Sequence, residues 1–286
     1  MTYDALGAGA LDYLPCRYGT SKLLFRGPRR PLKEPYIAFL GGTETYGKFI
    51  ANPFPELIEQ SIGRTCVNLG CVNAGVDVFA TDPQIVKIAS GADVTVLQLM
   101  GAHNMSNRFY TVHPRRNDRF LKPSTLLQAI YREVDFAEFN FNKHMLHRLY
   151  TLSPGRFDTV VVELQQAWLA RMRMLLGKIE GKVVLLWFAD HAPDDTFPPD
   201  QEKDPWFVTR EMIEELRSMP AELVEVTASP SSCALGTEGM VFSPMETPIA
   251  QQLLGPAAHQ EAAAALLESL WIEEMKKARL GAGLSK

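Results

Sequence analysis

The sequence lacks any apolar run of about 18 residues or more, the length that a membrane-spanning helix requires. Its first segment, MTYDALGAGALDYLP, carries Asp4 and has no basic stretch, so the pattern of a secretory signal peptide is missing. We therefore expect a cytoplasmic protein with no membrane span.

Cysteine is scarce, and the four cysteines form no CxxC pair. Cys66 and Cys71 lie in an apolar segment, where buried free thiols are expected. His144 and His147 are spaced as zinc ligands on a helix can be, but no third ligand of matching spacing follows. The phosphate-binding patterns GxGxxG and GxxxxGK[ST] are also missing. The sequence thus predicts no metal and no cofactor.

An excess of basic charge is missing as well. A net charge of −4, from 33 acidic and 29 basic residues, gives no long-range attraction to nucleic acid or to an anionic membrane. Apolar residues make up 46% of the 286 residues, enough to bury the core of one large domain. We expect a small-molecule substrate as partner, and the sequence leaves the oligomeric state open.

Apolar segments of strand length alternate with segments of helical spacing from residue 36 onward. The expected strands are 36–40, 65–69, 93–100, 182–188 and 222–226, and the expected helices are 54–62, 82–89, 124–134, 138–149, 158–176, 205–218 and 259–279. Strands that are apolar throughout indicate a parallel sheet covered on both faces. The fold class predicted is an α/β three-layer αβα sandwich with a mostly parallel, flavodoxin-like sheet.

The domain organisation expected is simple. Residues 1–35 are rich in Gly, Pro and Arg and form an N-terminal extension over the surface. Residues 36–280 form a single α/β domain, with a long loop insertion at 101–123, and residues 281–286 form a tail.

Polar side chains collect in the turns that follow the expected strands. The segment FLGGTETYG ends a strand with two glycines and then places Thr43 and Glu44 in the turn. Asn73, His103 and Asn104 follow two further strands, and His259 opens the last helix. In an open parallel sheet ligands bind beyond the carboxyl ends of the strands. Hydroxyl, imidazole and amide groups at this edge are what acyl-transfer chemistry uses.

Four segments, in order, resemble the blocks of the SGNH (GDSL-like) hydrolase and acyltransferase superfamily: FLGGTETYG at 39–47, VNLG at 67–70, LQLMGAHN at 97–104 and PAAHQEAAAAL at 256–266. The resemblance implies that Thr43 stands in the place of the nucleophilic serine and His259 in the place of the base. It further implies an oxyanion site built from Gly70, Asn73, His103 and Asn104. The sequence departs from the family's pattern at Gly42 and Pro256, where the family has aspartates, and at Thr43 itself.

The expected loop at 101–123 is rich in groups that bind anions. Tyr110, His113, Arg115, Arg116 and Arg119 lie close together in the sequence. Guanidinium groups bind carboxylate, phosphate or sulfate through paired hydrogen bonds, so these side chains are candidates for holding an anionic part of the substrate. The alternative is an Arg/Asp network that only fastens the loop to the surface.

Three functions remain open. The first is a divergent SGNH-like esterase or O-acyltransferase acting on a small, anionic or sugar-type ester. The second is a group transferase without a covalent intermediate, in which His259 or His103 deprotonates the acceptor and the arginines hold a sulfate- or phosphate-bearing donor. The third is a degenerate binding protein. Glu44, otherwise a substrate-binding or turn carboxylate, is a candidate general base if Thr43 is not a nucleophile.

Overall fold

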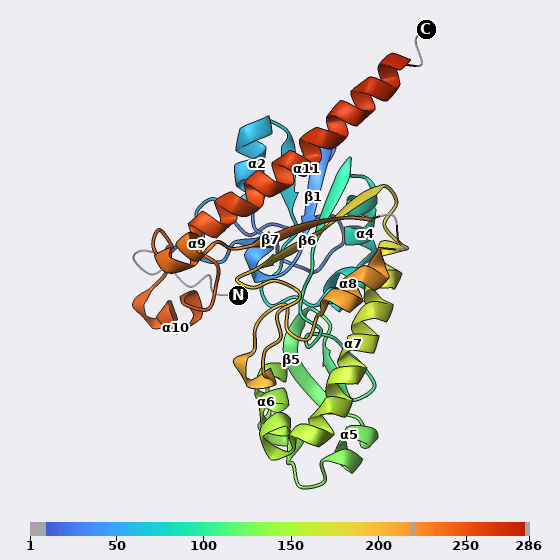
Figure 1. The fold of residues 1–286 in the computed structure, drawn as a ribbon, viewed down its shortest axis with the longest axis vertical. Helices are drawn as coiled ribbons and strands as arrows, with labels where there is room; N and C mark the ends of the chain where they lie inside the picture. Colours follow the sequence, from blue (N-terminus) through green and yellow to red (C-terminus); the bar gives the residue numbers. More distant parts are fainter. Residues whose placement is uncertain (1–9, 218, 220, 284–286) are drawn as a thin grey trace.

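The computed structural model of the chain describes residues 10–217, 219 and 221–283, and its centre is a five-stranded sheet (Figure 1). The strands are β1 (Tyr36–Leu40), β2 (Thr65–Asn68), β3 (Val94–Gln98), β6 (Lys182–Ala189) and β7 (Ala221–Thr227). Their order is β2-β1-β3-β6-β7, and every neighbouring pair is parallel. The predicted fold class, a parallel sheet inside a three-layer α/β sandwich, is confirmed.

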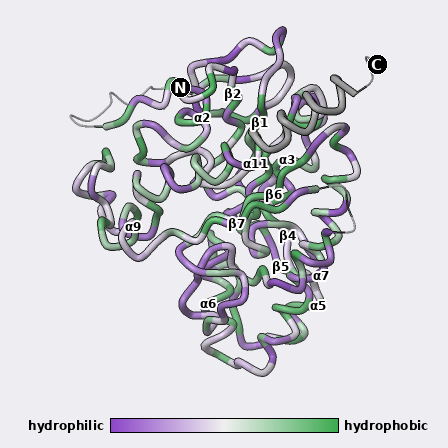
Figure 2. Tube along the Cα trace, turned by 45° about the horizontal axis from the view of Figure 1, so that its top comes forward, coloured by the Kyte–Doolittle hydropathy of each residue, from purple (hydrophilic) through white to green (hydrophobic). Residues whose placement is uncertain are grey.

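Helices cover both faces of the sheet because successive side chains of a strand point to opposite faces. Ile37 and Phe39 of β1 face one core, whereas Ala38 and Leu40 face the other. The first core lies under α2 (Phe54–Ile62) and α11 (Pro256–Gly283). The second lies under α3 (Val76–Ala80), α4 (Pro83–Ser90), α7 (Pro154–Leu176) and α8 (Arg210–Leu216). The central strands are accordingly the most apolar part of the chain trace (Figure 2).

Some helix ends follow the signals in the sequence. Asp82 caps α4 by accepting hydrogen bonds from the backbone N–H groups of Gln84 and Ile85, as its position predicts. Four predicted helix starts are displaced by three to five residues. α6 (Asn142–Leu152) begins at 142 instead of 138, and α11 begins at Pro256 instead of 259. α7 begins at Pro154, where Ser153 caps it, and α8 begins only at Arg210. The remaining helices are α1 (Thr43–Tyr46), α5 (Thr125–Ile130), α9 (Pro230–Leu235) and α10 (Thr247–Ala250).

The segment 101–123 contains a hairpin that the sequence analysis missed. β4 (Tyr110–His113) and β5 (Arg116–Pro123) pair in antiparallel fashion, with irregular register. Tyr110, Val112 and Phe120 are buried, so alternation is present but is carried by few residues. The hairpin, α5, α6 and the first turns of α7 lie together at the lower end of the molecule in Figure 1. This lobe follows β3 and therefore lies beyond the carboxyl ends of the strands.

Residues 10–35 pack closely on the domain. Tyr18 and Phe25 are fully buried, and the Arg26 guanidinium is buried with them. Arg26 donates to the carbonyl oxygens of Gly47 (2.8 Å) and Ala51 (2.7 Å), in the turn between α1 and α2. The segment thus supports the turn that leads out of α1. The domain boundaries placed at residues 35 and 280 stay predictions.

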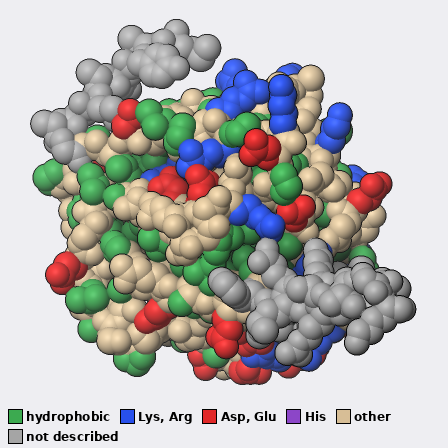
Figure 3. Space-filling model, turned by 90° about the horizontal axis from the view of Figure 1, so that it is seen from above, with side chains coloured by type: hydrophobic (Ala, Val, Ile, Leu, Met, Phe, Trp, Pro, Cys, Tyr) green, Lys and Arg blue, Asp and Glu red, His purple; other side chains and the backbone are tan. Residues whose placement is uncertain are grey.

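The surface carries charges of both signs. Acidic and basic side chains lie interspersed with apolar ones on the face shown in Figure 3. Among the residues described, no helix is both long enough and apolar enough to cross a lipid bilayer.

Gly75, at the start of α3, is the position where we expect substitution to damage the fold most clearly. A Cβ atom there would lie 1.6 Å from the carbonyl oxygen of Asn104, so the backbone would have to move. We expect Gly75→Ala to lower the free energy of unfolding by about 3 kcal/mol or more. The matched control is Gly155→Ala, because a Cβ at that exposed helical position meets nothing within 4 Å. Urea unfolding checks both, and equal stability of the two variants would contradict the packing described.

Candidate active site

The two glycines that end β1 have different roles. A Cβ on Gly41 would lie 2.1 Å from the Thr45 hydroxyl and 2.5 Å from Oε1 of Gln98, so only glycine fits there. A Cβ on Gly42 would have no neighbour closer than 3.7 Å. Oε1 of Gln98, at the end of β3, accepts hydrogen bonds from the Gly42 N–H (3.0 Å), the Thr45 N–H (3.2 Å) and the Thr45 hydroxyl (2.6 Å). One buried amide therefore fixes the whole turn.

Thr43 is held by the turn after β2. Its hydroxyl oxygen accepts a hydrogen bond from the Asn73 N–H (3.0 Å) and donates to Oδ1 of Asn73 (3.3 Å). The side chain is buried, with 9% of its surface exposed. The predicted neighbourhood of Thr43 and Asn73 is thus present. Both hydrogen bonds join the hydroxyl to Asn73, through its side-chain Oδ1 and its backbone N–H, and neither involves an imidazole.

The other predicted oxyanion donors are engaged in the frame of the site. The Gly70 N–H donates to Oδ1 of Asn68 (2.9 Å). The Asn104 amide donates to the Asn73 carbonyl (3.1 Å) and accepts from Asn142 (3.1 Å). These groups brace the ends of β2 and β3 against the lobe. An oxyanion role for them stays a prediction, and their present bonds do not favour it.

Glu44, next to Thr43, is partly buried and has an unusual affinity for its proton. The pKa of the Glu44 carboxyl is raised to about 7, mainly by burial and also by the negative charge of Asp204. Hydrogen bonds from its own N–H and from the Gln98 side chain, and the charge of Lys143, act in the opposite direction. A carboxyl with this pKa exchanges its proton readily at neutral pH.

Asp204 and Lys143 face this carboxyl and were not found from the sequence. Nζ of Lys143, on α6, lies 2.9 Å from Oδ2 of Asp204, in the long connection between β6 and α8. Burial raises the pKa of Asp204, but Lys143, His103 and the Trp206 N–H together outweigh burial and hold the pKa below its usual value. Asp204 is therefore ionised at pH values where Glu44 still holds its proton.

His103 lies beneath Asp204. Its Nδ1 is 3.8 Å from Oδ1 of Asp204, and its ring packs against Trp206 at 5.2 Å. Within the described part of the chain, neither ring nitrogen has a hydrogen-bond partner. Burial lowers the pKa of His103 to about 4, so the ring is neutral at pH 7. Tyr110 is buried, and its hydroxyl donates a hydrogen bond to the His103 carbonyl (2.6 Å), which supports the backbone at His103.

The predicted anion-binding side chains of the hairpin are spread out. Arg115 and Arg116 are exposed. Nδ1 of His113 accepts a hydrogen bond from the Arg115 N–H (3.2 Å), and the guanidinium of Arg119 lies 4.3 Å over the ring of Phe141. This arrangement favours the alternative in which these side chains fasten the hairpin, and their role in substrate binding stays a prediction.

His259 lies in apolar packing between α11, α2 and the sheet. Its ring stacks on Phe54 (5.8 Å) and meets Phe188 edge-on (5.2 Å), and 1% of its surface is exposed. Nδ1 accepts a hydrogen bond from the Phe54 N–H (3.2 Å), which is otherwise an unpaired donor at the start of α2. Burial lowers its pKa to about 3. These surroundings favour a structural role for His259 over the predicted role of base.

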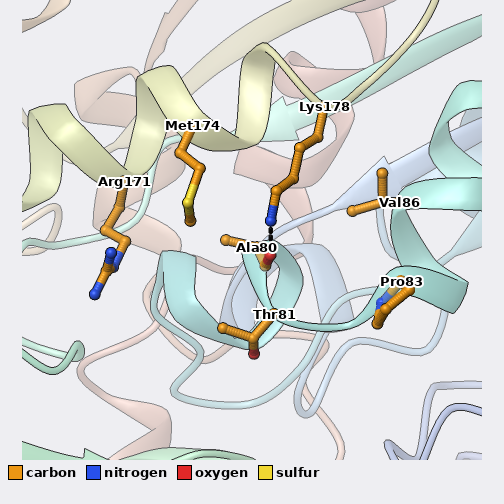
Figure 4. Close-up of a pocket in the computed structure, with 7 residues that line it drawn as sticks. All are labelled: Ala80, Thr81, Pro83, Val86, Arg171, Met174 and Lys178. Carbon is orange, nitrogen blue, oxygen red and sulfur yellow. Dashed lines mark hydrogen bonds between the residues drawn. The ribbon is translucent and has the colours of Figure 1, made fainter.

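A cleft of about 510 Å³ opens elsewhere, between α7 and the α3–α4 turn (Figure 4). Met174 and Val86 give it an apolar lining. Its cations are engaged, because Arg171 pairs with Asp77 (2.8 Å) and Lys178 donates to the Ala80 carbonyl (2.8 Å). The cleft contains none of the groups described above, so we place the site at Glu44 and Asp204 instead. In the part of the chain that the structure describes, no three His, Cys, Asp or Glu side chains gather as metal ligands.

Fold and site together define an α/β sandwich with titratable groups beyond the carboxyl ends of β1 and β3. The chain belongs to the family described as Domain of unknown function (DUF6473), which matches residues 1–275. No curated protein matches the sequence.

Solved structures resemble the chain only distantly. An extracellular lipase from Streptomyces rimosus is 11% identical, with a TM-score of 0.45, covering 82% of this chain and 99% of its own. A lipase from a goat rumen metagenome is 14% identical, with a TM-score of 0.39, covering 81% and 97%. An α/β hydrolase from the Lake Arreo metagenome is 13% identical, with a TM-score of 0.40, covering 82% and 94%. Likenesses at this level assign no activity to the chain.

Proposed function

We propose that this chain is an ester hydrolase or O-acyltransferase of a divergent SGNH-like branch, in which Glu44 moves the proton that a serine–histidine pair would otherwise move. The observation that carries the proposal is the Glu44 carboxyl, which follows Thr43 directly, accepts a hydrogen bond from Gln98 and has its pKa raised to about 7. A group that titrates near the working pH is the most effective general acid or base. The order of the four SGNH-like blocks supports the same proposal.

Thr43 is a positioning hydroxyl in this proposal rather than a nucleophile. Both hydrogen-bonding directions of its hydroxyl are used by Asn73. Its β-branched side chain also restricts the approach of a carbonyl carbon. Thr43 and Asn73 instead keep the start of α1 in the place where Glu44 meets the substrate.

The substrate proposed is a small ester that carries an anionic or sugar-type group. Lys143 supplies a positive charge beside Asp204, and its side chain is 36% exposed. The ionised pair offers donors and an acceptor for hydroxyl or carboxylate groups at the surface of the site. A cytoplasmic location also remains part of the proposal, and imaging of a tagged chain tests it.

A panel of aryl acetates and acetylated sugars tests the activity. We expect wild-type protein to hydrolyse at least one member, and Thr43→Val to lower kcat about tenfold because the Asn73 N–H loses its acceptor. Thr43→Ser, which retains the hydroxyl, serves as the matched control and keeps most of the rate. A fluorophosphonate should leave Thr43 unlabelled. Absence of hydrolysis and of transfer to added alcohols across the panel would overturn the proposal, and labelling of Thr43 would restore it as nucleophile.

A further inference from the structure

Asp204 is the second carboxyl group of the site, and it is better exposed than Glu44. Half of its side chain (53%) reaches the surface, although Lys143 and His103 pack against it. The Trp206 N–H donates to its Oδ1 (3.2 Å), and the Ala102 N–H donates to the Trp206 carbonyl (2.9 Å). The backbone after β3 thus holds the segment that carries Asp204 directly over the end of the sheet.

Gly101 makes this approach possible. A Cβ atom there would lie 2.7 Å from Nδ1 of His103 and 2.9 Å from Oδ1 of Asp204. The glycine therefore leaves room for the carboxylate and the imidazole to meet over the strand end. Lys143, on α6, also contacts Asp204, so three segments far apart in the sequence converge on one carboxylate.

The surroundings of the two carboxyl groups shift their pKa values in opposite directions. Glu44 is enclosed and meets the negative charge of Asp204 as well as the positive charge of Lys143. Asp204 meets the ammonium group of Lys143 at 2.9 Å and the imidazole of His103 at 3.8 Å. Two carboxyl groups kept in opposite protonation states form an acid–base pair without a histidine.

We propose that Asp204 is the general base and Glu44 the general acid in a direct attack of water, or of an acceptor hydroxyl, on the ester carbonyl. The inference rests on the proposed function and specifies its mechanism. Lys143 and His103 act as positioning residues that keep Asp204 in place. No acyl-enzyme forms, so this mechanism requires neither a serine nucleophile nor an aspartate before His259.

The proton balance closes within the site. Asp204 takes a proton from water while the water oxygen bonds to the carbonyl carbon. The bond between that carbon and the leaving oxygen then breaks, and Glu44 gives its proton to the leaving alcohol. The products are a carboxylic acid and an alcohol. Exchange with solvent returns the proton from Asp204 and reprotonates Glu44, so no oxidant, metal or further reactant is consumed.

The pair makes a specific prediction for the pH profile. Asp204 must be ionised and Glu44 protonated, so the rate should rise at low pH, pass through an optimum below pH 7 and fall above it. The charged groups that face Glu44 are Asp204 and Lys143. Those that face Asp204 are Lys143, Glu44 when ionised, and His103 when protonated. A histidine base would give the opposite trend, with the rate rising toward neutral and alkaline pH.

The test compares Asp204→Asn with Asp200→Asn, a control in the same connection whose side chain is exposed. We expect Asp204→Asn to lower kcat by about 10²–10⁴-fold and Asp200→Asn to leave it unchanged. In Asp204→Ala, added formate should restore part of the rate, because a small carboxylate can occupy the space of the base. Wild-type protein should show no burst of product in the first turnover.

Four outcomes would overturn the inference. If Asp204→Asn keeps its rate while Glu44→Gln loses it, Asp204 is not the base, and the proposed function stands. A product burst would indicate a covalent intermediate and exclude direct attack. If Asp204→Asn fails to fold, the wild-type pH profile decides alone, and a rate that rises through pH 7 contradicts the pair. If wild-type protein acts on no ester at all, the proposed function fails first.

Discussion

Glu44→Gln is expected to lower kcat for ester hydrolysis by about 10²–10⁴-fold, since the amide can neither give nor take the proton. Glutamine has nearly the same shape and keeps a hydrogen-bonding partner for Gln98, so the turn after β1 should remain intact. KM should change little, because the lost interaction belongs to the transition state. Initial rates of wild type and variant on the best ester of the panel provide the measurement.

The matched control for this variant is Gly42→Ala. A Cβ at Gly42 has no neighbour closer than 3.7 Å, so a methyl group fits beside Glu44 without removing any polar group. The alanine variant should keep a rate within a few-fold of wild type. Equal rates in wild type and Glu44→Gln, with both proteins folded, would remove Glu44 from the chemistry.

Glu44 also makes the free energy of unfolding depend on pH, in a direction that stability measurements can detect. Its pKa is about 7 in the folded chain and 4.5 in the unfolded reference, so between these values the folded state binds the extra proton. Stability therefore falls as pH rises from 4.5 to 7, by up to about 3 kcal/mol. Glu44→Gln should abolish this loss and be more stable than wild type at pH 8, with little difference at pH 4.5.

The second large effect is expected at His259, and it concerns stability rather than rate. His259→Ala leaves a cavity beside Phe54 and Phe188 and deprives the Phe54 N–H of its acceptor. We expect a loss of about 3–5 kcal/mol in the free energy of unfolding. The kcat of the fraction that remains folded should be close to that of wild type. Urea unfolding and active-site-normalised rates at low temperature separate the two quantities.

The dependence of stability on pH in the acid range also tests whether His259 is buried. Burial lowers the pKa of His259 to about 3 in the folded state, below the unfolded value of 6.5. The unfolded chain therefore binds the proton first, and the stability of wild type should fall as pH drops from 6.5 toward 3. His103 acts in the same direction, with a pKa of about 4. His259→Gln, which retains an acceptor, should weaken this dependence.

An opposite result would return His259 to the role of base. If His259→Ala unfolds at the same urea concentration as wild type but loses kcat by several orders of magnitude, its imidazole takes part in the chemistry. The structural role would then be wrong.

The sequence was sufficient for the sheet because the central strands β1, β3 and β6 are buried on both faces. The runs at 36–40, 65–69 and 182–188 agree with β1, β2 and β6 to within one residue. Helix caps such as Asp82 act locally and could also be predicted. The hairpin at 110–123 could not, because its alternation is broken by bulges and by polar residues between Val112 and Phe120.

The candidate site could be predicted only where it lies next to a strand end. Glu44 and His103 follow β1 and β3 directly, so the topology brings them together. Lys143 lies in a short helix and Asp204 in a long connection. Nothing in the sequence around either residue indicates that both lie at the carboxyl ends of the strands. Gln98 offered one signal, since a lone amide that ends an apolar strand must find buried partners.

His259 shows the limit of short motifs. A histidine at the start of the last helix fits the SGNH-like block by position, but its burial depends on how Phe54 and Phe188 pack around it. Packing of this kind involves residues more than about seventy positions away and leaves no mark in the motif itself.

Titration of the Glu44 carboxyl by NMR, on protein labelled with ¹³C at the glutamate side-chain carboxyl carbons, measures whether this group holds a proton at neutral pH. The resonance is assigned by its loss in Glu44→Gln. A midpoint near pH 7, moving to lower pH in Asp204→Asn, is the result predicted. A midpoint near 4.5 that is unaffected by Asp204→Asn would mean that Glu44 is an ordinary ionised carboxylate and that the proton in this site is moved by another group.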